Sequence, residues 1–330
     1  MALTIYDIAR RANVSITTVS RVLNNKGDVS ENTKRRIQQI LDESGYSPSQ
    51  LARGLASKSS KTVGIMAVDI RDVHHSTIVY QSERVLSMSG YSSIVCNLGG
   101  RKERLGEYLS MLTSRQVEGL IFVGSVFADE HCVRQIEDEG VSVPSIIINA
   151  VIDYPHFYSV LNDEDIAYPN AVDFLVQKNR SHIALIYDDD TISERRKRRG
   201  YRAGMLRNGL GDHIVEVPCP PEMEGAQAAT GRFMLEYPHT DAIIYTKDLI
   251  AAGGIHALCD LGRRIPEEVA VVGINNSIYA RICRPQLTSI DNQPKHQGQA
   301  AAKLLVKALE GDPPKEPYLI PCTLTERQST

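Results

Sequence analysis

Residue types that could catalyse a reaction or hold a metal occur along this 330-residue chain without the spacing that such chemistry needs. The three consecutive aspartates at 188–190 lack the spaced oxygen ligands of a calcium loop and are expected to form an exposed turn. No G-x-G-x-x-G, P-loop or nucleophile elbow is present, which argues against an enzyme and against a bound cofactor. The cysteines include no C-x-x-C pair, so we expect no zinc site and no disulfide framework, only buried free thiols at Cys96, Cys132, Cys219, Cys259, Cys283 and Cys322.

Basic side chains are concentrated in two places. Residues 1–60 carry nine lysines and arginines against five acidic residues, a net charge of +4, whereas the whole chain has a net charge of −3. A basic segment on an acidic remainder suggests contact with a polyanion, although a solvated helical surface could carry the same charge. The second place is a run of five basic residues at 195–199. On a helix these would spread around the whole circumference, so at most two of them can face one ligand.

Residues 1–47 are predicted to form an all-α unit of three short helices. Each helix follows a side chain that can cap it: Thr4 before 5–12, Ser15 before 16–23, and Ser30 before a helix that runs to about Ser44. The first two helices and their tight junction are typical of a helix-turn-helix. Residues 48–61 follow as a hinge linker with marginal helical character.

Residues 62–330 alternate apolar runs of strand length with amphipathic helical patterns, which predicts parallel sheets covered on both faces. There are too many units for one sheet, so we expect an α/β body of two lobes, about 62–160 plus 291–320 and about 161–290 plus 321–330. In such folds ligands bind at the carboxyl ends of the strands. The predicted strands are 63–68, 92–97, 119–123, 145–149, 182–187, 213–217, 242–246 and 269–274; the predicted helices are 76–90, 101–115, 130–140, 165–178, 194–208, 248–262 and 294–310.

The amino terminus lacks a basic segment followed by an apolar one, and no apolar run reaches the ~18 residues that a membrane span needs. We therefore expect a cytoplasmic protein without a membrane partner.

Two segments of the first unit, from Thr4 to Ala9 and from Val14 to Asn24, closely resemble the head of the lactose/galactose repressor (LacI/GalR) family. The resemblance continues through Ala52-Arg53-Gly54-Leu55-Ala56 and resumes at Val271-Val272-Gly273 and Leu287-Thr288-Ser289-Ile290. It implies a helix-turn-helix head, a hinge and a two-lobed body like a periplasmic binding protein. It also implies a transcriptional repressor that binds double-stranded operator DNA as a homodimer under the control of a small-molecule effector.

The resemblance also implies the DNA contacts. In the family the second helix enters the major groove, where Arg21 matches an arginine that can present two donors to a guanine. Leu55 matches a leucine that wedges into the minor groove. A surface salt bridge for Arg21 and a plain linker role for Leu55 stay open. The implied DNA-binding set is Thr4, Ser15, Ile16, Thr17, Thr18, Ser20, Arg21, Asn24 and Leu55.

For the effector, the resemblance implies contacts at strand ends from Arg71, Asn149, Asp163, Lys197, Lys247, Asp248 and Asn275. The chain departs from the family pattern: Lys247 replaces a common asparagine, Asn275 replaces a frequent carboxylate, and Lys197 stands where an arginine is expected. These changes predict an anionic effector, a sugar phosphate or a sugar acid. His74 and His75, near Arg71, are expected to be solvated.

Two other functions stay open. One is the same regulator controlled by a phosphoprotein corepressor, with which Lys197 is compatible; the other is an enzyme with a DNA-binding head. A periplasmic sugar-binding protein would need a signal peptide and would lack the head. No leucine-heptad tail follows Leu324, which favours a dimer over a tetramer.

Overall fold

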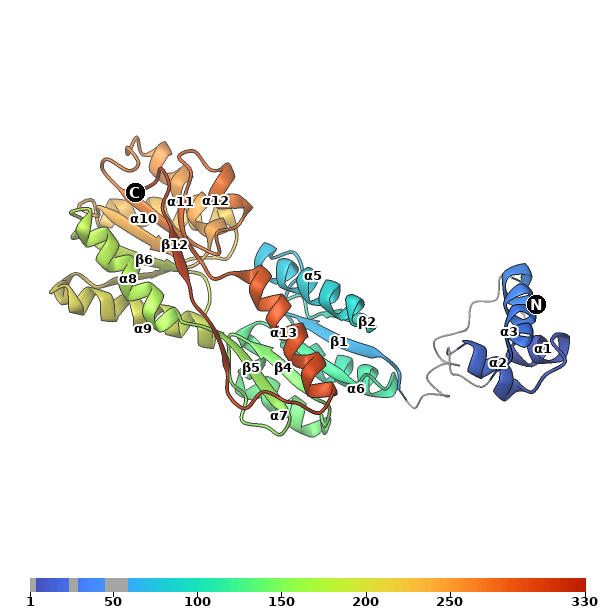
Figure 1. Cartoon of the computed structure of the whole chain (residues 1–330). Helices are drawn as coiled ribbons and strands as arrows, with labels where there is room; N and C mark the ends of the chain where they lie inside the picture. Colours follow the sequence, from blue (N-terminus) through green and yellow to red (C-terminus); the bar gives the residue numbers. More distant parts are fainter. Residues whose placement is uncertain (1–3, 24–28, 45–58) are drawn as a thin grey trace. The chain divides into compact units, whose positions relative to one another are not determined.

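The computed structural model describes residues 4–23, 29–44 and 59–330, and its contacts divide the chain into two compact units, Met1–Ser60 and Lys61–Thr330 (Figure 1). Asn24 and Leu55 lie outside the described residues. Among the helices that are described, none combines the length and the apolar character needed to span a bilayer.

The described part of the first unit consists of helices α1 (Ile5–Arg11), α2 (Ile16–Leu23) and α3 (Glu31–Ser44). The three predicted caps are confirmed: Thr4 and Asp7 form a capping box, and the hydroxyl oxygens of Ser15 and Ser30 accept hydrogen bonds from backbone N–H groups three residues on. The helices enclose a small core of their own, formed by Ile8, Ala9, Ala12, Val19, Ile37 and Leu41. This unit is the predicted helix-turn-helix head.

The second unit contains two six-stranded sheets, in the orders β11-β5-β4-β3-β1-β2 and β12-β10-β9-β8-β6-β7. Every pairing is parallel except that of β12 with β10, so the predicted α/β class with parallel sheets is confirmed. We call the lobe of the first sheet the N-lobe and that of the second the C-lobe. The strands are β1 (Thr62–Ala67), β2 (Ser92–Asn97), β3 (Gly119–Val123), β4 (Ser145–Ile148), β5 (Phe157–Asn162), β6 (Ile183–Tyr187), β7 (Val215–Pro218), β8 (Ala242–Tyr245), β9 (Ala270–Ile274), β10 (Thr288–Asp291), β11 (Tyr318–Ile320) and β12 (Thr323–Thr325).

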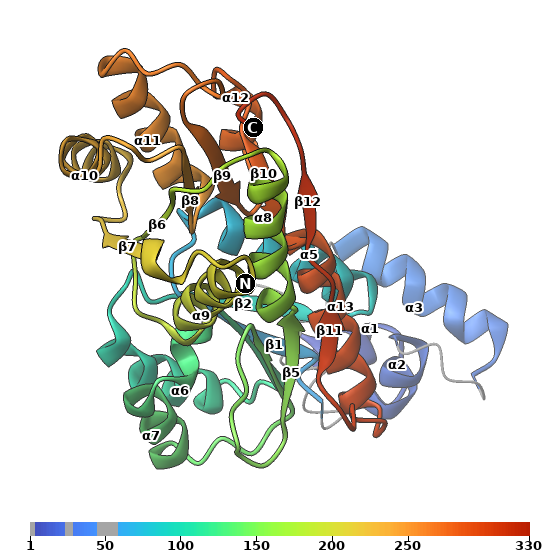
Figure 2. The same cartoon turned by 90° about the vertical axis from the view of Figure 1, so that its left-hand side faces the viewer.

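Helices cover both faces of each sheet. In the N-lobe α5 and α13 pack on one face and α6 and α7 on the other; in the C-lobe α8 and α9 pack on one face and α10 and α11 on the other (Figures 1 and 2). The helices of the body are α5 (Val73–Met88), α6 (Leu105–Ser114), α7 (Glu130–Asp138), α8 (Glu164–Gln177), α9 (Ile192–Arg207), α10 (Met223–Glu236), α11 (Asp248–Asp260), α12 (Ile278–Ile282) and α13 (Pro294–Leu309), with short 3-10 turns at Lys102–Arg104, Ser125–Ala128 and Gly211–His213.

The chain passes between the lobes three times, after β5, after β10 and after β11. A buried amide network ties these crossovers together. The Asn162 side chain donates to the carbonyl oxygens of Asn292 (3.0 Å) and Ile320 (3.2 Å), and the Gln297 amide donates to Asn162 Oδ1 and to the Asn292 carbonyl. The crossovers therefore form one hydrogen-bonded hinge beside the strand ends.

Close packing of α10 on α11 gives a prediction about glycine. A Cβ added at Gly253 would lie 2.2 Å from the carbonyl oxygen of Met223, and backbone cannot yield as a side-chain tip does. Gly253→Ala is therefore expected to lower the free energy of unfolding by about 1–3 kcal/mol. Gly231→Ala on the same helix pair is the control, because nothing lies within 4 Å of its added Cβ. That variant should gain up to about 1 kcal/mol from helix propensity. If urea unfolding showed the same change in free energy for Gly253→Ala and Gly231→Ala, the close packing of α10 on α11 at Gly253 would be contradicted.

Candidate functional site

The exposed face of α2 carries three residues of the predicted DNA-binding set. Val19 is buried, whereas Ile16, Thr17 and Arg21 are exposed. Positions 17 and 21 are four residues apart, so they share one helix face. Among the described residues of the head, the only ion pair is Lys34 with Glu31, so the structure supplies no salt bridge for Arg21. The face can therefore present a free guanidinium to a partner.

Several hydroxyls of the predicted DNA-binding set already have partners within the head. Thr4 Oγ1 donates to Asp7 Oδ2 (2.6 Å), and this contact lowers the pKa of Asp7. Ser15 Oγ and Thr18 Oγ1 lie 2.9 Å apart. Ser20 is half-buried. Thr4, Ser15 and Thr18 thus fix the starts of α1 and α2. The exposed side chains of α2, such as Arg21, carry the hydrogen-bonding groups that remain available to a partner.

In the body, a cavity of about 100 Å³ lies where strand-end loops of both lobes meet, and we call it the interlobe cavity. Four of the seven predicted effector residues line it, namely Asn149, Lys197, Lys247 and Asn275. Further polar residues that line it were not assigned to the effector: Asp72, His74, His75, Ser125, Glu164, Asp189, Thr191, Ser193, Glu194 and Asn292.

Both lysines of the interlobe cavity are ion-paired. Lys197 Nζ lies 2.6 Å from Glu194 Oε1 and donates to the Thr246 carbonyl at 3.3 Å. Lys247 Nζ lies 2.7 Å from Oδ2 of Asp188, whose side chain is fully buried. Burial opposes the charge of Lys247, but the carboxylates of Asp188 and Asp72 outweigh it and raise the lysine pKa. The prediction of an exposed turn at 188–190 is therefore wrong for Asp188.

Two buried glutamates face the same cavity, and burial raises the pKa of each. Glu164 Oε1 accepts from Ser193 Oγ (2.6 Å), while its Oε2 has only a distant ion pair with Arg196 Nε at 3.8 Å. Glu194 Oε2 has no hydrogen-bond partner among the residues that the structure describes. Each glutamate thus presents one carboxylate oxygen with unused hydrogen-bonding capacity.

The two histidines also belong to the cavity wall. Burial lowers the pKa of His74 to about 3 and lowers that of His75, so both rings are neutral near pH 7. Their Nδ1 atoms are buried and lack hydrogen-bond partners within the described part of the chain. The expectation that both histidines are solvated is therefore wrong, and the available signal was their position in the first turn of α5, at the end of the loop that follows β1.

The other three predicted effector residues lie away from the cavity. The Arg71 side chain is 83% exposed and pairs with Asp69 at 2.6 Å. Asp163 accepts the Cys322 N–H in the hinge, at 2.6 Å. Asp248 is buried and accepts from the Ser277 N–H and from Ser289 Oγ, both at 2.6 Å. Asp248 therefore holds the loop that carries Asn275 instead of facing the cavity.

Of the five basic residues at 195–199, only Lys197 lines the cavity. Arg196 crosses to the N-lobe, where its guanidinium donates to the carbonyl oxygens of Asn149 (3.4 Å) and Asn162 (2.9 Å). The remaining arginines pair with carboxylates of the C-lobe: Arg195 with Asp190, Arg198 with Asp190 and Glu216, and Arg199 with Asp165. The expectation of buried free thiols is confirmed for Cys96, Cys132 and Cys219 and is wrong for Cys259, which is exposed; Cys283 and Cys322 are half-buried.

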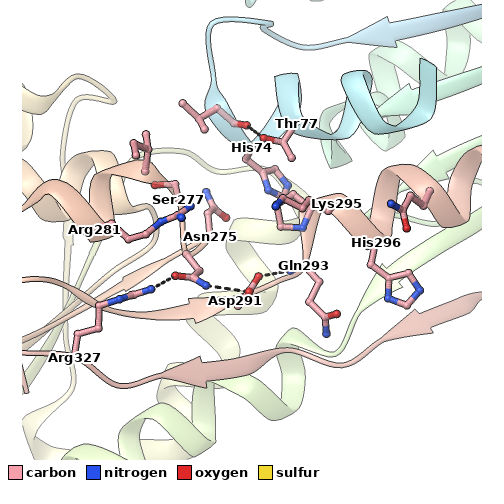
Figure 3. Close-up of a pocket in the computed structure, with 15 residues that line it drawn as sticks. His74, Thr77, Asn275, Ser277, Arg281, Asp291, Gln293, Lys295, His296 and Arg327 are labelled. Atoms are coloured by element: carbon pink, nitrogen blue, oxygen red, sulfur yellow. Dashed lines mark hydrogen bonds between the residues drawn. The ribbon is translucent and has the colours of Figure 1, made fainter. Parts of the chain in front are cut away.

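A second, larger pocket of about 560 Å³ opens between α5, the loop before α12 and the start of α13, and we call it the outer pocket (Figure 3). Its cations differ from those of the interlobe cavity. Among the described residues, Arg281, Lys295 and Arg327 form no ion pair. The carboxylate in its wall, Asp291, is held by Asn276 Nδ2 (3.0 Å) and by the Gln293 N–H (2.7 Å). The outer pocket is therefore positively charged.

Comparison with known proteins places both units. Residues 4–49 match the bacterial regulatory proteins of the lacI family, and residues 172–330 match the periplasmic binding protein-like domain. The lac repressor dimer bound to operator and the anti-inducer ONPF has the same fold, with a TM-score of 0.91 at 24% identity over 100% of this chain and 99% of that chain. A LacI family regulator from Enterococcus faecium with bound ribose covers 82% of this chain and 98% of its own, with a TM-score of 0.72 at 23% identity. An HTH-type transcriptional regulator of Lachnoclostridium phytofermentans is 33% identical over 332 residues, 99% of each chain, and the chain therefore belongs to the LacI family of DNA-binding transcriptional regulators with an effector-binding domain.

Proposed function

We propose that the chain is a repressor that binds operator DNA as a homodimer and releases or tightens its hold when a small effector occupies the interlobe cavity. The observation that carries the proposal is a cavity built by both lobes in a chain whose other unit exposes a recognition helix. The proposed activity is binding without catalysis, in keeping with the regulatory relatives. The dimer is proposed by analogy with the lac repressor dimer on its operator.

Contacts at the cavity wall suggest how an effector would act. Arg196 of α9 donates to N-lobe carbonyls, one of them on the cavity residue Asn149, and the Ser193 N–H donates to Ser125 Oγ at 3.3 Å. These bonds hold one arrangement of the lobes. A ligand that binds that arrangement more tightly than another shifts the balance between them. The head then responds through the linker at 48–61.

The geometry weakens the case for an anionic effector. An anion in the interlobe cavity would have to draw Lys197 from Glu194 and Lys247 from Asp188, and would leave buried carboxylates without partners. Control by a phosphoprotein corepressor depended on an accessible Lys197. That side chain is only 8% exposed and forms an ion pair with Glu194, so this alternative loses its support. We therefore propose a small-molecule effector that donates hydrogen bonds.

The DNA-binding half of the proposal predicts the effect of Arg21→Ala. Loss of a two-donor contact to a base should weaken operator binding by about 1–3 kcal/mol and relax the base preference at one position per half-site. Fluorescence anisotropy with the upstream region of the chain's own gene, and with single-base variants of the protected site, measures both. Arg36→Ala, at an exposed arginine of α3, is the charge-matched control. If both variants weaken all sequences equally, Arg21 contacts phosphate and not a base.

A further inference from the structure

We propose that the interlobe cavity selects a small organic cation rich in hydrogen-bond donors, such as an amino sugar, in preference to neutral or anionic analogues. This inference rests on the proposed function, since it names the chemical class of the effector for that same cavity. Its support comes from the charges in the wall, from the polar atoms left without partners, and from the contrast with the outer pocket.

The wall of the cavity carries more negative than positive charge. Four carboxylate residues line it, Asp72, Glu164, Asp189 and Glu194, against two ammonium groups, Lys197 and Lys247. Two charged groups lie directly behind the wall: Asp188, which pairs with Lys247, and Arg196, which pairs with Glu164. Their opposite charges cancel, so they do not change the excess of negative charge. The histidines are neutral at pH 7, as described above. With all carboxylates ionised, the site therefore has an excess of two negative charges. Asp189 is exposed to solvent, whereas Glu164 and Glu194 are buried where water screens charge weakly.

The free hydrogen-bonding capacity of the cavity is mostly that of acceptors. In the described part of the chain, ten buried side-chain nitrogen and oxygen atoms lack a hydrogen-bond partner, and six of them belong to residues of this wall. Four of the six are oxygens: Asn149 Oδ1, Glu164 Oε2, Glu194 Oε2 and Asn292 Oδ1. All four residues are at most 7% exposed. Buried acceptors of this kind need N–H or O–H groups from a ligand, and a carboxylate gains most from a charged donor.

A neutral polyol would satisfy the oxygens but would leave the excess charge in place. An ammonium group on a sugar-sized ring would also satisfy the oxygens, because it brings three N–H donors, and its positive charge would reduce the excess from two negative charges to one. It would also lower the raised pKa values of Glu164 and Glu194 by stabilising their ionised forms, as any nearby cation does. The volume of about 100 Å³ limits the ligand to a small molecule.

The outer pocket shows how the same body presents cations to solvent. Arg281 and Lys295 are exposed there and form no ion pair among the described residues, whereas the interlobe cavity holds a buried Lys197 and a half-buried Lys247, both paired with carboxylates. An anion added to this protein is therefore expected to bind in the outer pocket. The two cavities differ in charge although His74 and Asn275 line both.

The test is calorimetric titration of the full-length protein with three matched sets: glucosamine, glucose and glucose 6-phosphate, and the corresponding galactose and mannose compounds. In at least one set the amine should bind at least tenfold more tightly than the neutral sugar. Glu194→Gln, which keeps the shape of the side chain, should weaken amine binding about 10- to 100-fold and change neutral-sugar binding much less. Any binding of a sugar phosphate should be lost in the double variant Arg281→Ala and Lys295→Ala, and it should be kept in Glu194→Gln.

Three results would overturn the proposal: a neutral sugar or a phosphate that binds best in the cavity, an amine that Glu194→Gln leaves unaffected, or no binding by any of the amines. A DNA-binding assay with the same amines separates this inference from the proposed function. Amine binding that leaves operator affinity unchanged would keep the cavity's selectivity and reject its role as the effector site. Operator release by a neutral sugar and not by the amines would keep the proposed function and reject the selectivity for a cation.

Discussion

Lys247→Met is expected to lower the free energy of unfolding of the body by about 3–5 kcal/mol, because it leaves a buried charge without its partner. Lys247 Nζ lies 2.7 Å from Oδ2 of Asp188, and the Asp188 side chain has no exposed surface. The carboxylate would then lose its charged partner while its own side chain stays shielded from water. The methylene groups of methionine keep most of the packing of the lysine stem, so the loss measures charge. Urea unfolding followed by circular dichroism measures the change.

Two further variants separate charge burial from other effects. Lys178→Met breaks an ion pair of similar length, 2.5 Å to Glu326, in which both side chains are exposed, and it should cost at most about 1 kcal/mol. Asp188→Asn in the Lys247→Met background removes the unpaired charge and should recover most of the lost stability. A cost for Lys247→Met no larger than that for Lys178→Met would mean that Asp188 is solvated in solution. The double variant should then recover nothing.

Much of the fold follows from local sequence signals. Thr4, Ser15 and Ser30 mark helix starts because a capping side-chain oxygen accepts from a backbone N–H only three residues on, so the signal lies within a few residues of sequence. Most of the eight predicted strands show a continuous apolar run, whereas β7 is a four-residue edge strand interrupted by Glu216. The missed strands β10, β11 and β12 are three or four residues long, and β5 interrupts its apolar residues with Ser159. Their pairing depends on neighbours far away in the chain, which local patterns do not contain.

The candidate site was less predictable, for a physical reason visible at Lys247 and Asp248. These adjacent residues at the start of α11 point to different surroundings: Lys247 into the interlobe cavity and Asp248 beneath the loop at 275–277. Strand-end position predicts that a residue lies near the cleft, but not which way its side chain points. Nor does it predict ion-pair partners such as Asp188, which neutralise the cations that suggested an anionic effector. The position of these residues near the cleft was therefore predictable from the sequence, whereas the net charge of the interlobe cavity was not.

Stability of the body should depend on pH through Asp248, because burial raises the pKa of this carboxyl to about 6 in the native state. In the unfolded chain it titrates near 3.8. Below about pH 4 both states hold the proton and Asp248 has no effect on the pH dependence. Above about pH 6 both have lost it, and the native state bears the full cost of a buried charge. Between these limits Asp248 should lower stability by about 3 kcal/mol as pH rises.

The variant Asp248→Asn isolates this contribution. An asparagine can still accept the Ser277 N–H and can donate to Ser289 Oγ, so the loop that carries Asn275 keeps its support while the ionisable group is gone. Its stability relative to the unmodified chain should therefore rise from pH 4.5 to pH 7.5 in urea unfolding. Glu268→Gln is the opposite case, since hydrogen bonds from the backbone and side chain of Arg264 lower the pKa of that exposed carboxylate. Relative to the unmodified chain it should lose stability as pH rises, by a smaller amount. A flat difference for Asp248→Asn would mean that water reaches Asp248, and that the loop bearing Asn275 opens in solution.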